Sequence, residues 1–174
     1  MKENEHIFLT GFMGSGKTTV GKKLARLLRL TFIDMDEYIE KRERLTVQSL
    51  FENFGEAIFR KIERSCLEEI LKKDEKMVVA LGGGTICYEN NLEKIKKAGV
   101  LIYIELPVAT LTQRLENAKG KRPLLKNLKG EELSTFIENK LNERKDYYHK
   151  AHIIVSGLSL TPQILREKIS EHKQ

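Results

Sequence analysis

Short apolar runs alternate along this chain with longer segments in which apolar residues recur at helical spacing. Five runs rich in Ile, Val, Leu or Phe predict strands over residues 6–10, 30–34, 77–81, 100–106 and 152–156. Nearly continuous apolar runs are typical of parallel strands that are covered by helices on both faces. The pattern therefore predicts a five-stranded parallel sheet.

The segments between these runs predict the covering helices. One apolar stripe consists of Val20, Leu24, Leu27 and Leu28, and a second, in steps of four, of Ile58, Ile62, Cys66 and Ile70. We expect further helices around residues 90–98, 108–116, 131–148 and 161–172. The alternation predicts a single domain over residues 1–174, an α/β fold built as a three-layer α/β/α sandwich, with ligands at the carboxyl ends of the strands.

The first strand is followed by a glycine-rich loop, G-F-M-G-S-G-K-T at 11–18, which matches G-x-x-x-x-G-K-[ST] and leads into an amphipathic helix. Its backbone N–H groups and the positive end of the helix are suited to phosphate, Lys17 to the β and γ phosphates, and Thr18 to Mg²⁺. A turn that merely caps a helix is the alternative. The predicted nucleotide-binding residues are Gly11, Met13, Gly14, Ser15, Gly16, Lys17, Thr18 and Thr19.

Two carboxylates, Asp34 and Asp36, stand at the end of the second predicted strand. If the strand continues through both, their side chains point the same way. One could then support Mg²⁺ through water while the other accepts a proton from an acceptor hydroxyl. Alternatively, Asp36 caps a helix over residues 37–42. The third strand ends without the acid of a Walker B motif, which leaves metal support to Asp34 and Thr18.

Three further features carry candidate chemistry. Gly82, Gly83 and Gly84 follow the third strand, either as a flexible turn or to let backbone N–H groups approach a small polyhydroxy acid. Arg60 lies between Glu56 and Glu63 on a predicted helix, either in a surface ion pair or as a positioned guanidinium for a carboxylate. The irregular basic segment 117–130 is either a solvated loop or an active-site cover.

Composition and charge exclude several classes. Two cysteines and four histidines provide neither a disulfide framework nor zinc-site spacing, and no apolar run is long enough to span a bilayer. The first residues resemble neither a signal nor a transit peptide, so we expect a cytoplasmic protein. The net charge of +6 reflects either solvated lysines or an anionic partner, but the basic residues are not interleaved with aromatics as nucleic-acid binding would favour.

Taken together, these motifs resemble shikimate kinase. The phosphate loop and F-I-D-M-D at 32–36 are followed in order by F-G-E-A-I-F-R-K-I-E at 54–63, A-L-G-G-G-T at 80–85, K-R-P-L-L at 121–125 and E-R-K-D-Y-Y at 143–148. The resemblance implies a P-loop kinase fold that transfers the γ-phosphoryl group of Mg²⁺-ATP to the 3-hydroxyl of shikimate. It also implies a helical substrate-binding region at about 35–62 and a lid loop at about 114–130, and we expect a monomer without nucleic-acid or membrane partners.

The resemblance also implies roles for particular residues. Asp34 matches the acid that supports magnesium, and Asp36 matches the acid that contacts the acceptor hydroxyls and is the candidate base. Arg122 matches the lid arginine that reaches the ATP phosphates and is a candidate for catalysis together with Lys17. The expected acceptor site consists of Asp36, Arg60, Gly82, Gly83, Gly84 and Arg144.

The chain departs from the family pattern at one place. Asn90-Asn91-Leu92 stands where the family usually has an Asn-Arg pair, so any role of that arginine is absent or displaced. The alternatives are another small kinase of this architecture, acting on a nucleoside monophosphate or gluconate, and a P-loop module that senses nucleotides or binds nucleic acid.

Overall fold

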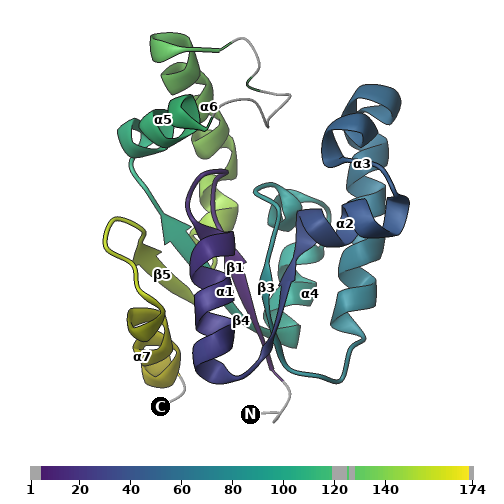
Figure 1. The fold of residues 1–174 in the computed structure, drawn as a ribbon, viewed down its shortest axis with the longest axis vertical. Coiled ribbons are helices and arrows are strands. Elements are labelled where there is room, and N and C mark those ends of the chain that lie inside the picture. Colours follow the sequence, from purple (N-terminus) through teal and green to yellow (C-terminus); the bar gives the residue numbers. More distant parts are fainter. Residues whose placement is uncertain (1–4, 119–124, 126–127, 173–174) are drawn as a thin grey trace.

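Five parallel strands form the central sheet of the computed structural model, which describes residues 5–118, 125 and 128–172 (Figure 1). The strands are β1 (His6–Thr10), β2 (Thr31–Asp34), β3 (Met77–Ala80), β4 (Gly99–Glu105) and β5 (Ile153–Ser156). Their order in the sheet is β2-β3-β1-β4-β5, and each pair of neighbours is parallel. The predicted parallel sheet is confirmed, with each strand end within one residue of its expected position.

Helices cover both faces of this sheet (Figure 1). They are α1 (Lys17–Leu28), α2 (Met35–Glu43), α3 (Val47–Leu71), α4 (Asn91–Ala98), α5 (Val108–Asn117), α6 (Gly130–Tyr148) and α7 (Pro162–His172), with a 3₁₀ turn η1 (Thr85–Cys87). The core against α1 and α7 contains Ile7 and Leu9 of β1, whereas Phe8 between them belongs to the core on the opposite face. Both sides of the strand are buried, which explains why its sequence is continuously apolar.

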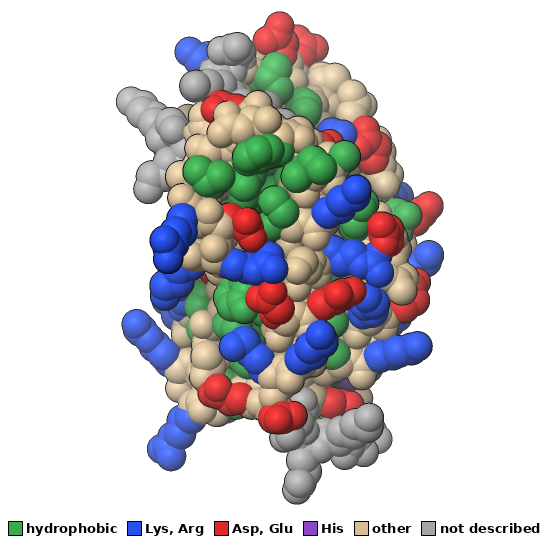
Figure 2. Space-filling model, turned by 90° about the vertical axis from the view of Figure 1, so that its right-hand side faces the viewer, with side chains coloured by type: hydrophobic (Ala, Val, Ile, Leu, Met, Phe, Trp, Pro, Cys, Tyr) green, Lys and Arg blue, Asp and Glu red, His purple; other side chains and the backbone are tan. Residues whose placement is uncertain are grey.

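One predicted apolar stripe on α3 is partly wrong. Ile58 is 42% exposed, while Phe59, Cys66, Leu67 and Ile70 are buried. Steps of four residues overshoot a full helical turn by about 40° each, so three steps rotate a side chain by about 120° away from the buried face. Figure 2, which views the molecule from the side of α3, shows apolar side chains gathered on the upper part of this face and mixed positive and negative charges elsewhere.

The sheet topology brings three loops to one edge. β2, β3 and β1 are neighbours, and in the register Ala80 pairs with Leu9 on one side and with Asp34 on the other. The phosphate loop after β1, the start of α2 after β2 and the glycines after β3 therefore lie together at the carboxyl ends of the strands. None of the helices in the described part of the chain combines the length and the apolar character that a membrane crossing requires.

Candidate active site

The loop between β1 and α1 has the backbone of a phosphate-binding loop. Gly11, Gly14 and Gly16 have φ angles of 147°, 80° and 94°, a region that residues with a side chain rarely adopt. A Cβ atom on Gly11 would also lie 2.6 Å from the carbonyl oxygen of Ile104. All three positions therefore favour glycine, and two of them, Gly11 and Gly16, are the glycines that the motif specifies.

Lys17 is held over the mouth of this loop. Lys17 is the first residue of α1, and only 9% of its surface is exposed to solvent. Its Nζ donates to the carbonyl oxygens of Gly11 (2.7 Å) and Phe12 (3.0 Å). The hydroxyl of Ser15 accepts a longer bond of 3.4 Å. The ammonium group thus lies within the ring of backbone that would surround a bound phosphate.

Asp34 connects the phosphate loop to the start of α2. Its Oδ2 accepts a hydrogen bond of 2.6 Å from the Thr18 hydroxyl, and its Oδ1 accepts from the N–H groups of Asp36 (3.0 Å) and Glu37 (3.3 Å). Asp34 is therefore the N-cap of α2, and the alternative in which Asp36 caps a helix over 37–42 is wrong. The strand ends at Asp34, so the two carboxylates do not project from one continuous strand.

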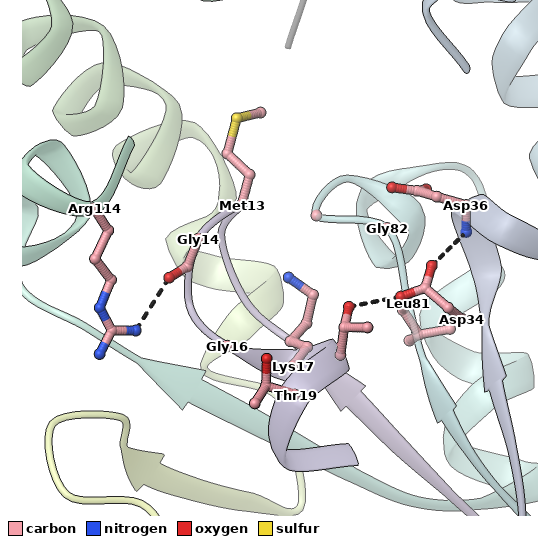
Figure 3. A pocket seen from close by; sticks show the side chains of 12 residues that line it. Met13, Gly14, Gly16, Lys17, Thr19, Asp34, Asp36, Leu81, Gly82 and Arg114 are labelled. Atoms are coloured by element: carbon pink, nitrogen blue, oxygen red, sulfur yellow. Dashed lines mark hydrogen bonds between the residues drawn. The ribbon is translucent and has the colours of Figure 1, made fainter. Parts of the chain in front are cut away.

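A cavity of about 400 Å³ opens between the phosphate loop and α2 (Figure 3). Lys17 and Thr18 line one side, and Asp34, Asp36 and the backbone of Gly82 line the other. The cavity therefore brings the predicted nucleotide site and the candidate base to a shared space.

Arg114 also lines this cavity, although the sequence reading did not single it out as a site residue. Its Nη1 donates to the carbonyl oxygen of Gly14 (3.1 Å; Figure 3). A neighbouring cavity of about 310 Å³ extends from Arg114 towards Thr161 and Pro162. In the sequence it is one arginine on a solvated helix, with no local signal that it reaches a loop 100 residues away.

The backbone of residues 82–84, called the triglycine segment below, lies against all the predicted acceptor-site side chains. A Cβ on Gly82 would lie 3.6 Å from Asp36 Oδ1, and one on Gly83 would lie 3.2 Å from Arg144 Nη1. One on Gly84 would lie only 2.5 Å from Arg60 Nη2. The structure thus brings Asp36, Arg60 and Arg144 together, although they come from α2, α3 and α6.

Arg60 is held by a buried carboxylate and not by a surface pair alone. Its Nη1 lies 2.7 Å from Glu63 Oε2, and the side chains of the two residues are 13% and 1% exposed. Glu56, the second partner at 3.3 Å, is 68% exposed. Burial opposes the charge on Arg60, but attraction and hydrogen bonding with Glu63 outweigh it and raise the pKa of Arg60. The alternative of a surface ion pair is therefore wrong for the pair of Arg60 and Glu63.

Two further residues behind the triglycine segment were missed in these roles. The Thr85 hydroxyl donates to Glu63 Oε1 (2.7 Å), so Glu63 is held from both of its oxygens. Asn91, one of the residues that departs from the family pattern, is fully buried and donates from Nδ2 to the Thr85 carbonyl (2.9 Å).

Of the two other predicted arginines, Arg144 lies over the Phe12 ring at 5.7 Å from its centroid. Arg122 falls outside the described residues.

Comparison with known proteins agrees with this geometry. The family model for shikimate kinase matches residues 13–173. A shikimate kinase from Azobacteroides pseudotrichonymphae genomovar. CFP2 is 43% identical over 148 residues, which cover 85% of this chain and 87% of that protein. Two solved structures cover 97% of this chain: shikimate kinase from Bacteroides thetaiotaomicron (39% identity, TM-score 0.85, 93% of that chain) and from Acinetobacter baumannii in complex with shikimate (35%, 0.86, 92%).

Proposed function

This chain belongs to the shikimate kinase family, and from that premise we propose that it transfers the γ-phosphoryl group of ATP to the 3-hydroxyl of shikimate, giving shikimate 3-phosphate and ADP. One observation carries the assignment of the site. A single stretch of backbone, residues 82–84, lies against Asp36, Arg60 and Arg144, and its first two residues line the cavity that contains Lys17. An acid and two guanidinium groups beside a phosphate loop suit a hydroxylated carboxylate that receives a phosphoryl group.

The nucleotide occupies the phosphate loop, with its phosphates on the backbone N–H groups of residues 11–16 and the Lys17 ammonium. The neighbouring cavity between Arg114 and Pro162 takes the nucleoside, because it is continuous with the phosphate loop through Gly16 and Thr19, which line both spaces. In phosphoryl transfer the protein chiefly positions the reacting groups and balances the negative charge of the phosphates, and Lys17 does both at the terminal phosphates.

The residues near the phosphates fit a magnesium ion. Thr18 Oγ1 and Asp34 Oδ2, which lie 2.6 Å apart, are hard oxygen ligands, and Mg²⁺ in nucleotide sites is typically held by one or two protein oxygens, phosphates and water. The described residues contain no cluster of three or more His, Cys, Asp or Glu that could hold a metal. When bound, the ion would neutralise charge on the β and γ phosphates.

The acceptor is recognised from its two ends. Arg60 and Arg144 bind the ring carboxylate, where planar guanidinium groups allow paired hydrogen bonds that lysine cannot make. Asp36 receives the reacting hydroxyl, orients it towards the cavity that it shares with Lys17, and takes its proton as the phosphoryl group transfers. Backbone N–H groups of the triglycine segment contact the remaining hydroxyls.

The proposal includes four further features that the sequence predicted: the acceptor-binding region, the monomeric state, the cytoplasmic location and the lid. α2 and the first half of α3, within the expected region 35–62, form the acceptor-binding region, and the enzyme acts as a monomer in the cytoplasm. A lid over residues 114–130 with Arg122 on the phosphates remains a prediction, because Arg122 lies outside the described residues.

The test is ADP release in the presence of Mg²⁺-ATP with each acceptor in turn. We expect turnover with shikimate and none above background with gluconate or with a nucleoside monophosphate. Product is identified by ³¹P NMR as a phosphate monoester on the 3-hydroxyl. If ATP consumption is independent of shikimate but increases with DNA or RNA, the proposal is contradicted, and the result favours a nucleic-acid-dependent ATPase.

A further inference from the structure

Tyr148, the last residue of α6, is buried against the triglycine segment. It is 0% exposed, and its hydroxyl donates a hydrogen bond of 2.6 Å to the carbonyl oxygen of Gly83. Its ring stacks on Tyr103 of β4, with centroids 4.7 Å apart and planes 15° apart. The stacking fixes the ring from the sheet, so the hydroxyl is a fixed point against which the loop is held.

This hydrogen bond determines how one peptide plane of the segment is oriented. The peptide between Gly83 and Gly84 is trans, so the N–H of Gly84 points away from Tyr148 when the Gly83 carbonyl points towards it. Glycine on both sides of a peptide leaves its orientation weakly restrained. The neighbouring carbonyls of Gly82 and Gly84 accept from the backbone N–H groups of Thr85 (3.2 Å) and Cys87 (3.0 Å), whereas that of Gly83 takes the Tyr148 side chain.

The same helix carries one of the proposed acceptor-binding arginines. Arg144 precedes Tyr148 by four residues, about one turn, and a Cβ on Gly83 would lie 3.2 Å from its Nη1. The hydroxyl bond to Gly83 therefore ties the end of α6 to the glycine that the Arg144 guanidinium faces. A shift of the segment relative to α6 would change the distance between the guanidinium and the backbone N–H groups.

We propose that Tyr148 is a positioning residue for the acceptor: its hydroxyl fixes the Gly83–Gly84 peptide and the distance from this peptide to Arg144 in the arrangement that binds shikimate. The inference rests on the proposed function. Burial raises the pKa of Tyr148 to about 12, despite the opposing charge of Arg144 and the hydrogen bond between the two side chains, so the hydroxyl remains a donor at neutral pH. Tyr148 does not itself line the cavity at the phosphate loop, and the side chain nearest to Gly83 is that of Arg144, so we expect the loss of the Tyr148 hydroxyl to act chiefly on the acceptor.

The test compares Tyr148→Phe with Tyr103→Phe. Each variant removes one hydroxyl from the same stacked pair, but only Tyr148→Phe removes the bond to Gly83 and the contact of that hydroxyl with Arg144. For Tyr148→Phe we expect the KM for shikimate to rise roughly five- to tenfold, the loss typical of one hydrogen bond, with kcat and the KM for ATP within about twofold of the parent. For Tyr103→Phe we expect all three constants to stay within about twofold.

A second measurement reports on the peptide directly. The ¹⁵N amide signal of Gly84 follows the hydrogen bond on the preceding carbonyl, so it should shift in Tyr148→Phe and remain in place in Tyr103→Phe. Thermal unfolding of both variants records any general loss of stability, which would not by itself raise the KM for one substrate alone.

Three results would overturn the proposal. One is an unchanged KM for shikimate in Tyr148→Phe, and another is an equal loss for both substrates. The third is a Tyr148→Phe chain that does not fold while Tyr103→Phe does, because the hydroxyl would then serve the core and not the site. Failure of the proposed function is distinguishable, since it would appear as absent shikimate phosphorylation in the parent chain.

Discussion

Replacing Glu63 by glutamine tests the buried ion pair that orients Arg60. Glu63 accepts hydrogen bonds of 2.7 Å from Arg60 on one oxygen and of 2.7 Å from Thr85 on the other. Glutamine keeps the shape of the side chain but removes its charge and turns one of the two acceptors into an N–H donor. The Thr85 hydroxyl can reverse its role and accept from the new N–H, so the main change is electrostatic: Arg60 retains a charge whose buried counter-charge has been removed.

The size of the effect follows from the geometry. Two charges whose centres lie about 4 Å apart attract by about 4 kcal/mol at an effective dielectric constant of about 20. Removing the buried charge of Glu63 returns part of this through its lower desolvation cost, while Arg60, only 13% exposed, keeps its own. We expect the free energy of unfolding to fall by about 2–3 kcal/mol, which lowers the Tm of a domain of this size by about 5–10 °C.

The measurements are thermal unfolding followed by circular dichroism and steady-state kinetics with shikimate varied. A loosened Arg60 should raise the KM for shikimate about tenfold and leave the KM for ATP near that of the parent. Glu56→Gln is the matched control, because it removes the other partner of the same arginine at a 68% exposed position, where an ion pair contributes at most about 0.5 kcal/mol. A Tm within about 2 °C of the parent in Glu63→Gln, or equal effects in both variants, would refute the reasoning.

Three further changes separate the parts of the site. Asp36→Asn should lower kcat by about 10²- to 10⁴-fold while ATP binding, measured by calorimetry, stays nearly intact; an active variant would exclude Asp36 as the base. Asp34→Asn keeps a side chain that can cap α2 but weakens the acceptor for Thr18, so the Mg²⁺ concentration for half-maximal ADP release should rise at least tenfold, and an unchanged titration would remove Asp34 from metal support. Arg114→Ala should raise the KM for ATP about fivefold and leave the KM for shikimate unchanged; the reverse pattern would place the nucleoside elsewhere.

Local pattern predicted the sheet and the phosphate loop because both are encoded by adjacent residues. The strand at residues 6–10 and the helices around 108–116 and 131–148 appear within one residue of their expected bounds. The error on α3 has the same origin, since a stripe read in steps of four ignored the rotation that accumulates at each step. The start of α2 was also misread, because either Asp34 or Asp36 satisfies the preference for a capping residue and only the backbone decides between them.

The contacts that complete the site leave no comparable local trace. Tyr148 and Gly83 are 65 residues apart, and Arg114 and Gly14 are 100 residues apart. A tyrosine at the end of a helix, or an arginine on a solvated one, is common, so nothing near them in the sequence distinguishes a residue that reaches the site. Motif resemblance indicated Arg60 and Arg144, and the sequence placed Glu63 beside Arg60, but neither indicated Thr85 behind Glu63 or Tyr148 on Gly83.

The triglycine segment shows why these supporting contacts matter for function. Its residues bring no side chains of their own, and a Cβ at Gly84 would occupy the space 2.5 Å from the Arg60 guanidinium. Omitting side chains lets an acid and two arginines from three helices approach one backbone, but the same omission leaves that backbone weakly restrained. The restraint has to come from outside the segment, which is where Tyr148 on Gly83, and Thr85 and Glu63 behind Arg60, make their hydrogen bonds. We therefore predict that specificity for the acceptor depends on residues that need not touch it.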